Sequence, residues 1–172
     1  MSAAGEAHAR APMLSEAALR SIDRELAKYP PDQKQSAVMS ALAIAQDEHG
    51  WLSPAAMDFV AHYLGMAPVA VYEVATFYAM YNQEPVGKYK ITICTNLPCA
   101  LQGATVAAEH LKAKLGVGFG ETTADGLVTL KEGECFGACG DAPVLLVNNK
   151  RMCSFMRPEK IDALLVELGA PK

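Results

Sequence analysis

Four cysteines of this chain form two close pairs whose spacing suits metal binding. Cys94 and Cys99 are separated by four residues, Cys135 and Cys139 by three, and thirty-five residues lie between the pairs. Thiolates bind soft and borderline metals strongly, and a fold that joins two short pairs places four sulfurs around a small centre. The first hypothesis is therefore a four-thiolate metal or cluster site.

The spacing also bears on which metal such a site would hold. Structural zinc sites usually leave about two residues between paired ligands, because the turn wraps one ion tetrahedrally. Wider loops with glycines suit a two-iron cluster, in which each iron takes two thiolates and backbone N–H groups face the sulfurs. Gly103, Gly137 and Gly140 stand beside the cysteines. These features favour a [2Fe–2S] cluster, with zinc or a pair of disulfides as the alternatives.

The remaining cysteine and three histidines lie outside this pattern. Cys153 falls in a predicted strand, where a small buried residue is the simpler interpretation and a redox-sensitive thiol near the cluster is the alternative. His49, His62 and His110 have no partner at ligand spacing, so we expect surface or core histidines. The absence of a Cys-x-His pair argues against a Rieske centre, which needs two histidines on one iron.

Length, charge and hydropathy limit the class of protein. The 172 residues suffice for one ordinary domain or two small ones, and a hydrophobic content of 51% supports a core. The net charge of −4 comes without a basic block, which argues against nucleic acid and anionic membranes as partners. No secretory signal or membrane span is evident, so we expect a bacterial cytoplasmic protein, where disulfides are disfavoured.

The first half of the chain predicts a small helical bundle over residues 15–84, after a flexible arm at 1–14. Apolar residues recur at helical spacing, with prolines or glycines at the ends of each run. The expected helices are 15–29, 38–49, 54–64 and 68–78. Four short helices joined by tight turns form a bundle, which we expect to dock a partner.

An aromatic and methionine cluster follows the fourth predicted helix. It consists of Phe77, Tyr78, Met80 and Tyr81. Apolar residues at this spacing usually belong to a core, and we expect the same here, with a partner-docking surface as the alternative.

The second half, residues 85–172, predicts a mixed α/β domain. Tyr89, Ile91 and Ile93 alternate with polar residues in a half-buried strand that ends at Cys94. A helix, a strand, a hairpin and a last helix follow at 104–115, 127–130, 144–154 and 158–168. This order is that of a thioredoxin-like sheet, whose first two strands are parallel through a right-handed crossover. Because parallel strands end together, both cysteine pairs should meet at one edge of the sheet.

The sequence therefore predicts an α+β protein, a helical bundle followed by a thioredoxin-like domain that carries the cluster. A thioredoxin's Cys-x-x-Cys is missing, which argues against dithiol exchange. The glycines of residues 116–120 follow a helix and lack the strand-to-helix context of a dinucleotide loop, so we expect a connector there.

Several motifs together resemble those of a known family. The chain is similar to the 24-kDa, thioredoxin-like [2Fe–2S] subunit of NADH:quinone oxidoreductase, respiratory complex I. The matching stretches are GWLSP at 50–54, VYEVATFY at 71–78, PVGKY at 85–89, CTNLPC at 94–99, GETTADG at 120–126 and ECFGACGDAP at 134–143.

The resemblance implies a division of roles between subunits. It implies that Cys94, Cys99, Cys135 and Cys139 hold the [2Fe–2S] cluster, and that FMN and NADH bind to a larger partner subunit. The chain would then be an electron-transfer subunit without catalytic residues of its own. It would lie among the other complex I subunits, in a peripheral arm on the cytoplasmic face of the inner membrane, without entering the membrane.

Two other functions fit the same motifs. One is the small subunit of a diaphorase module in an NAD-linked formate dehydrogenase or hydrogenase. The other is a stand-alone thioredoxin-like ferredoxin that acts as an electron shuttle, which the helical half argues against, because a diffusing carrier has no evident need of a docking domain.

Overall fold

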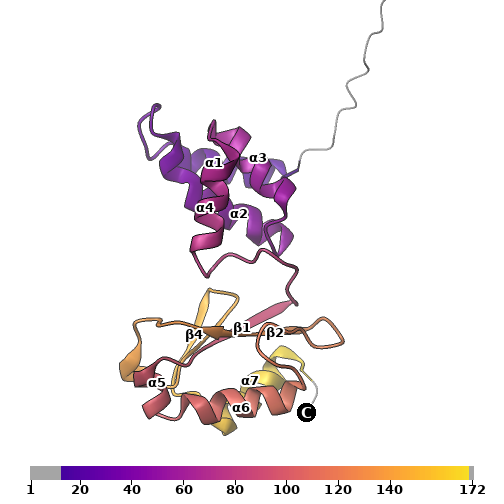
Figure 1. The fold of residues 1–172 in the computed structure, drawn as a ribbon. Helices are drawn as coiled ribbons and strands as arrows, with labels where there is room; N and C mark the ends of the chain where they lie inside the picture. The colour runs from indigo at the N-terminus through magenta and orange to yellow at the C-terminus, as the bar shows by residue number, and fades with distance from the viewer. Residues whose placement is uncertain (1–12, 171–172) are drawn as a thin grey trace, which may run out of the picture. The chain divides into compact units, whose positions relative to one another are not determined.

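The computed structural model describes residues 13–170, and the chain divides into two compact units between Glu84 and Pro85. The first unit is helical, and the second contains a four-stranded sheet with helices (Figure 1). The α+β class predicted from the sequence is confirmed. Residues 1–12 of the expected arm lie outside the described residues, and within 13–170 no helix is long and apolar enough to cross a membrane.

The first unit contains the four expected helices and one short 3₁₀ turn. These elements are α1 (Glu16–Leu26), η1 (Lys34–Ala37), α2 (Val38–His49), α3 (Pro54–Leu64) and α4 (Pro68–Phe77). Helix α1 ends three residues earlier than expected. Tyr29 precedes Pro30, and the residue before a proline disfavours helical backbone. The helix therefore ends with two i→i−3 hydrogen bonds, which the N–H groups of Lys28 and Tyr29 donate.

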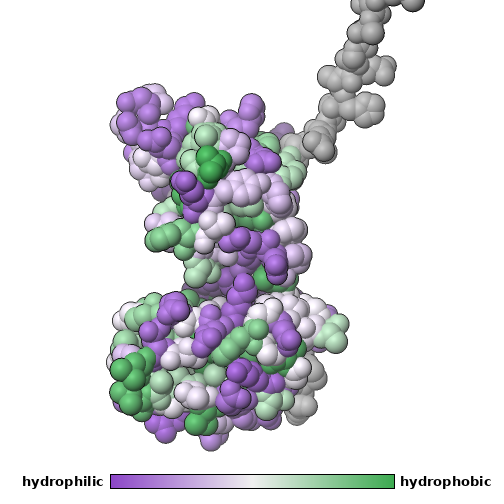
Figure 2. Space-filling model, in the orientation of Figure 1, coloured by the Kyte–Doolittle hydropathy of each residue, from purple (hydrophilic) through white to green (hydrophobic). Residues whose placement is uncertain are grey.

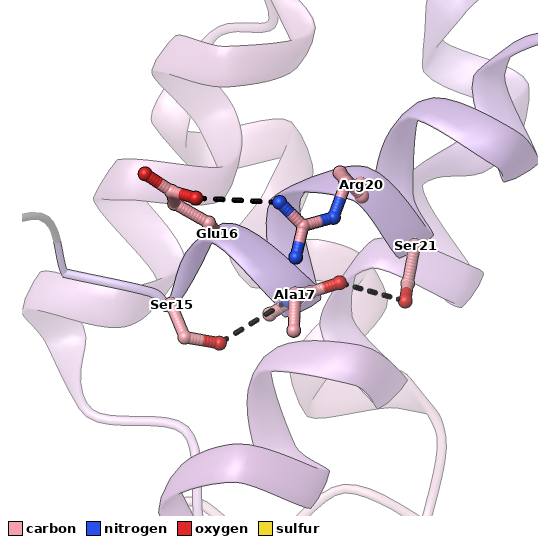
Figure 3. A network of polar contacts seen from close by, with 6 residues as sticks. Ser15, Glu16, Ala17, Arg20 and Ser21 are labelled. Atoms are coloured by element: carbon pink, nitrogen blue, oxygen red, sulfur yellow. Dashed lines mark hydrogen bonds and ion pairs between the residues drawn. The ribbon is translucent and has the colours of Figure 1, made fainter.

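Caps fix the ends of these helices. The Ser15 hydroxyl accepts the N–H of Ala18, while the Ser15 N–H and hydroxyl each donate to the Glu48 carboxylate at 2.8 Å and so join α1 to α2. Figure 3 shows this first turn of α1, with the Arg20–Glu16 ion pair on its outer face. Helices α2 and α3 end at Gly50 and Gly65, whose positive φ angles of 79° and 67° suit glycine.

The core of the first unit lies between the helices. Its fully buried side chains include Leu14, Ile22, Leu42, Val60 and Val71. Leu14, which the sequence grouped with the N-terminal arm, is therefore part of this core.

The aromatic cluster after α4 differs from the expectation of a core. Tyr81 is buried and donates its hydroxyl hydrogen to the Met39 carbonyl, but Phe77 is 79% exposed and Tyr78 and Met80 are 39% exposed each. Helix α4 ends at Phe77, and the Tyr78 backbone is extended. The helix therefore stops before Tyr78 and Met80, and Phe77, its last residue, lies on its exposed side, so the core assignment was wrong for these three of the four residues.

The second unit is built on a sheet with strand order β2-β1-β3-β4. Its elements are β1 (Tyr89–Cys94), α5 (Leu97–Leu101), α6 (Ala104–Leu115), β2 (Val128–Gly133), η2 (Cys139–Asp141), β3 (Leu145–Val147), β4 (Arg151–Cys153) and α7 (Pro158–Leu168). Strands β1 and β2 are parallel and the other pairs antiparallel. Helices α6 and α7 cover one face of the sheet (Figure 1), and the core between them includes Ile91, Ile93, Leu111 and Ile161.

Two local features of the sheet are the turn of the β3–β4 hairpin and the burial of Lys90. The β3–β4 hairpin connects Val147 to its partner Arg151 through a three-residue loop, in which Asn148 and Asn149 both lie in the left-handed region and Lys150 donates its N–H to the Val147 carbonyl at 3.1 Å. Lys90, which the alternating pattern places on a solvent face, is 2% exposed, and burial, with a smaller effect from Lys131, lowers its pKa to about 8.

The Glu48 link gives the first unit a predictable dependence on acid. Hydrogen bonds from the Ser15 hydroxyl and, to a smaller extent, from the Ser15 N–H lower the Glu48 pKa below its usual 4.5. The link therefore stabilises the folded unit above that pH, and this stabilisation is lost as the pH falls through the pKa of the folded state. We expect acid to lower the melting temperature of the wild-type chain more than that of Glu48→Gln. The single tryptophan, Trp51, reports on this unit by fluorescence. Parallel losses in the two proteins would contradict this assignment.

Candidate metal centre

The register of β1 and β2 brings the two cysteine pairs together. Cys94, the last residue of β1, lies opposite Gly133, the last residue of β2. Since the strands are parallel, the chain leaves both of them at the same edge, and Cys135 follows Gly133 by two residues. We expected from the sequence that the two pairs would meet at one edge, because the two strands would be parallel. The structure shows this parallel pairing.

The four thiols differ in their exposure to solvent. Cys94 and Cys99 are 1% exposed and belong to a small apolar cluster with Ala104 and Val144. Cys99 is buried because α5, a helix that the sequence did not predict, turns it inward. Cys135 and Cys139 are exposed, in the loop after β2 and at the start of η2.

The thiols interact within each pair and between the pairs. Burial raises the Cys99 pKa to about 11, and a hydrogen bond with Cys94 and the charges of Cys94 and Cys139 add to this rise. Burial and the charge and hydrogen bond of Cys135 raise the Cys139 pKa, and Cys94 contributes again. The raised pKa values favour the protonated form of the Cys99 and Cys139 thiols, so metal binding to these two must release protons.

The four thiols are grouped as two pairs that act on each other. Within residues 13–170, no three Cys, His, Asp or Glu side chains converge closely enough to hold a single metal ion. Cys94 nevertheless raises the pKa of Cys99, Cys135 raises the pKa of Cys139, and charges also act between the two pairs. A structural zinc ion needs four ligands around one centre, whereas a two-iron cluster needs two thiolates at each iron. Two adjoining thiol pairs are the donor set of a cluster that takes two thiolates at each iron.

Backbone N–H groups face the sulfurs, as a cluster requires. Gly137, at a φ of 73°, donates its N–H to Cys135 Sγ at 3.3 Å. The N–H of Val144 donates to the Cys99 sulfur and opposes the rise in its pKa, while the Val144 carbonyl accepts the Cys94 N–H at 3.1 Å. Such donors stabilise negative charge on thiolate ligands.

The match to known proteins identifies the family. A family model described as thioredoxin-like [2Fe–2S] ferredoxin matches residues 22–169, which span both units. The chain belongs to this family. The predicted cofactor, a [2Fe–2S] cluster, is the one for which the family is named.

Individual relatives carry more specific names. The chain is 38% identical over 151 residues to NADH-quinone oxidoreductase subunit 2 of Thermus thermophilus, covering 88% of this chain and 83% of the relative. It is 42% identical over 149 residues to another NADH-quinone oxidoreductase subunit, from Rhizobium meliloti, covering 87% of each. Both relatives are named as subunits of an NADH-quinone oxidoreductase, in agreement with the resemblance noted from the sequence.

A solved structure shares the fold. A chain of an NAD⁺-reducing [NiFe]-hydrogenase in the H₂-reduced state superposes with a TM-score of 0.67 over 77% of this chain, at 24% identity. This chain spans 22% of the length of that hydrogenase chain.

In this family member, side chains join the two cysteine loops. The Thr95 hydroxyl donates to Glu132 at 2.7 Å, and the Asn96 amide donates to Glu134 at 2.9 Å. Asp141 accepts a hydrogen bond from the Ser154 hydroxyl at 2.8 Å. The acids that the sequence places near the cysteines therefore have side-chain donors that hold the loops in position, a role that spacing alone did not reveal.

The packing of Phe136 on Gly133 sets the path of the second loop. A Cβ at Gly133 would lie 2.5 Å from Phe136 Cζ and 2.7 Å from Thr92 Cγ2. Phe136 in turn packs against the apolar cluster that contains Cys94 and Cys99. Only glycine at the end of β2 permits this packing.

Other residues singled out from the sequence lie outside the centre. Cys153 is buried in β4, as the simpler interpretation predicted, and burial raises its pKa. His110 contacts Asp162 at 2.8 Å, and His49 contacts the Met13 carbonyl. Residues 116–120 follow helix α6 and precede β2 without forming a strand-to-helix turn.

We expect Gly133→Ala to distort the second cysteine loop. The added methyl group would overlap Phe136 and Thr92, and overpacking of this kind costs about 1–3 kcal/mol. Iron and labile sulfide per chain and the melting temperature should both fall. Gly140→Ala is the matched control in the same loop, since nothing lies within 4 Å of its Cβ position. Equal cluster content in the two variants would rule out this role for Gly133.

Proposed function

We propose that this chain is the electron-transfer subunit of an NADH:quinone oxidoreductase of the complex I type. Its [2Fe–2S] cluster would exchange single electrons with the flavin of a partner subunit that oxidises NADH. The observation that carries this proposal is the pairing of Cys94–Cys99 with Cys135–Cys139 at one edge of the sheet, in a chain whose relatives are named as subunits of that enzyme.

Cys94, Cys99, Cys135 and Cys139 are the proposed iron ligands. When bound, the cluster supplies a centre that accepts and donates one electron at a time. The protein holds the four sulfurs by the two strand ends, by α5 and by the links from Thr95 and Asn96. The Gly137 and Val144 N–H groups offset the negative charge at the sulfurs, and the apolar cluster around Cys99 keeps water from one side.

The need for a flavin-bearing partner follows from electron counting. NADH gives two electrons together, whereas an iron–sulfur cluster takes one, so a flavin must stand between them. Residues 116–120 lack the context of a dinucleotide loop, which supports assigning NADH and FMN to a larger partner subunit.

The helical unit and the location of the complex belong to the same proposal. Residues 15–84 would provide a docking domain, which the exposure of Phe77, Tyr78 and Met80 supports. The chain would lie with other complex I subunits in a peripheral arm on the cytoplasmic face of a bacterial inner membrane.

A hydrogenase or formate dehydrogenase diaphorase module is the second candidate. The fold shared with the NAD⁺-reducing hydrogenase chain favours it, although at 24% identity this likeness concerns the fold alone. Co-purification from native membranes separates the two, because membrane-spanning subunits in the same particle favour complex I.

The ligand assignment predicts a clear difference among the five cysteines. The wild-type chain, made with iron and sulfide available, should hold two irons and two acid-labile sulfides. Ala at position 94, 99, 135 or 139 should abolish or strongly reduce the electron paramagnetic resonance signal of the reduced cluster. Cys153→Ala is the control, and its signal should match the wild type. One zinc without labile sulfide, or loss of the signal in Cys153→Ala alone, would refute the assignment.

The partner assignment predicts how NADH acts on the cluster. NADH alone should leave the visible absorbance of the purified chain unchanged. Addition of the flavin-bearing, NADH-oxidising subunit in catalytic amount should let NADH bleach it, because the flavin splits the electron pair. Bleaching by NADH without any flavoprotein would refute the division of roles.

A further inference from the structure

The two outer strands of the sheet differ in how their free edges are covered. These strands are β2 and β4 (Figure 1). Three backbone hydrogen bonds join residues 120–123 to the free edge of β2, two of them through Leu130. Within residues 13–170, β4 pairs with β3 alone. An uncovered edge strand can pair with another chain, so β4 is the edge at which such pairing can occur.

The backbone of β4 directs a donor and an acceptor of one residue away from the sheet. The Val144 carbonyl and the Asn148 N–H bond to β1 at 3.1 and 2.8 Å. Backbone groups alternate in direction along a strand, so those of Leu146 also face β1. Met152 lies opposite Leu146 in the β3–β4 pair. The N–H and carbonyl of Met152 therefore point outward, toward the open edge.

This arrangement is complementary to itself. Two residues that face each other in a hydrogen-bonded antiparallel pair exchange both of their N–H···O bonds. Met152 of one copy can therefore pair with Met152 of a second copy across a two-fold axis, and the two sheets become continuous. The Met152 side chain is 45% exposed and belongs to neither core. A contact of this kind uses the same patch on both copies.

Helix α7 adds a groove along the same edge. A cavity of ≈ 320 Å³ is lined by residues of β4 and α7, among them the buried side chains of Met156 and Leu164. Three exposed residues of α7 also line it, namely Lys160, Ala163 and Glu167. Their spacing of three and four residues places them on one face of the helix.

The charges along this groove have a fixed order. Lys160 Nζ donates to the Ser154 carbonyl at 3.4 Å, and Arg151 Nη2 donates to Glu167 Oε2 at 3.1 Å. Helix α7 therefore runs antiparallel to β4. A two-fold rotation reverses this order, so Lys160 of each copy faces Glu167 of the other, with the small Ala163 near the axis. A carboxylate can accept from two cations, so Glu167 can keep its bond to Arg151.

We propose that β4 and the Lys160–Glu167 face of α7 form a self-association surface, through which two copies of this chain pair antiparallel at Met152. Polar and apolar residues alternate over much of the visible face of the second unit (Figure 2), and the register is set by backbone pairing and charge order. Because β4 has three residues, the contact is small and the dimer weak. This surface is independent of the proposed function, because it contains none of the proposed iron ligands.

A proline at position 152 tests the strand pairing. In the full, cluster-loaded chain, Met152→Pro removes the outward N–H from each copy and no bond between β3 and β4. Sedimentation equilibrium should show a concentration-dependent wild-type dimer, and an affinity about tenfold or more lower for Met152→Pro. Met152→Leu is the matched control, because it keeps the N–H and an apolar side chain, and its affinity should equal that of the wild type.

Charge reversal tests the two-fold order. Lys160→Glu and Glu167→Lys each place like charges across the axis, so each variant alone should self-associate about fivefold or more weakly than the wild type. In an equimolar mixture, a mixed dimer has opposite charges at both positions, and its affinity should recover. Recovery in the mixture is specific to two copies of the chain in this arrangement.

Each outcome decides for or against the self-association surface. A wild-type chain that stays monomeric up to about 1 mM, Met152→Pro that associates like the wild type, or a mixture that associates no better than its components overturns the proposal. If Met152→Pro melts lower or loads less cluster, the mixture decides, because its substitutions lie on exposed side chains. A monomeric wild-type chain that binds another protein, with binding weakened by Met152→Pro, assigns the edge to a partner's strand and also overturns it. The cluster signal and NADH-driven bleaching test the proposed function separately.

Discussion

The parallel pairing of β1 with β2 is the constraint on which the centre depends. Its register places Cys94 opposite Gly133, so two segments separated by more than thirty residues leave the sheet at one edge. The crossover through α6 and the antiparallel strand β3 on the other side hold β1 in the centre of the sheet. A shift of one residue in this register would reverse the faces of every following side chain and separate the cysteines.

Local contacts then convert a shared edge into a ligand set. Helix α5 turns Cys99 inward, Val144 contacts both Cys94 and Cys99 through its backbone, and the bare α-carbon of Gly133 admits the ring of Phe136. The side-chain bonds from Thr95 and Asn96 close the gap between the loops. The contacts of Val144 and the hydrogen bonds from Thr95 and Asn96 cross between segments far apart in the sequence, which is why removal of one of these is expected to affect both pairs.

Much of this arrangement was predictable from the sequence, because it rests on local patterns. The period of two in Tyr89, Ile91 and Ile93 predicted β1, and the proline and glycine boundaries predicted α3 and α7 closely. Helix α5 was missed because five residues are too few for a helical period. The burial of Lys90 and the exposure of Phe77 depend on which surfaces the fold covers, and side-chain pattern does not specify that. The meeting of the cysteines followed from strand direction, whereas the exposure of one pair depends on loop packing.

The two thiol pairs differ in burial, so the two sides of the candidate centre differ in polarity. An added electron brings negative charge, which water near Cys135 and Cys139 stabilises better than the apolar surroundings of Cys94 and Cys99 do. If each pair binds one iron, the two iron positions are energetically inequivalent before any partner arrives. Cys135 and Cys139, if they hold one of the irons, would favour the reduced state there, because water at their exposed side would stabilise the added negative charge.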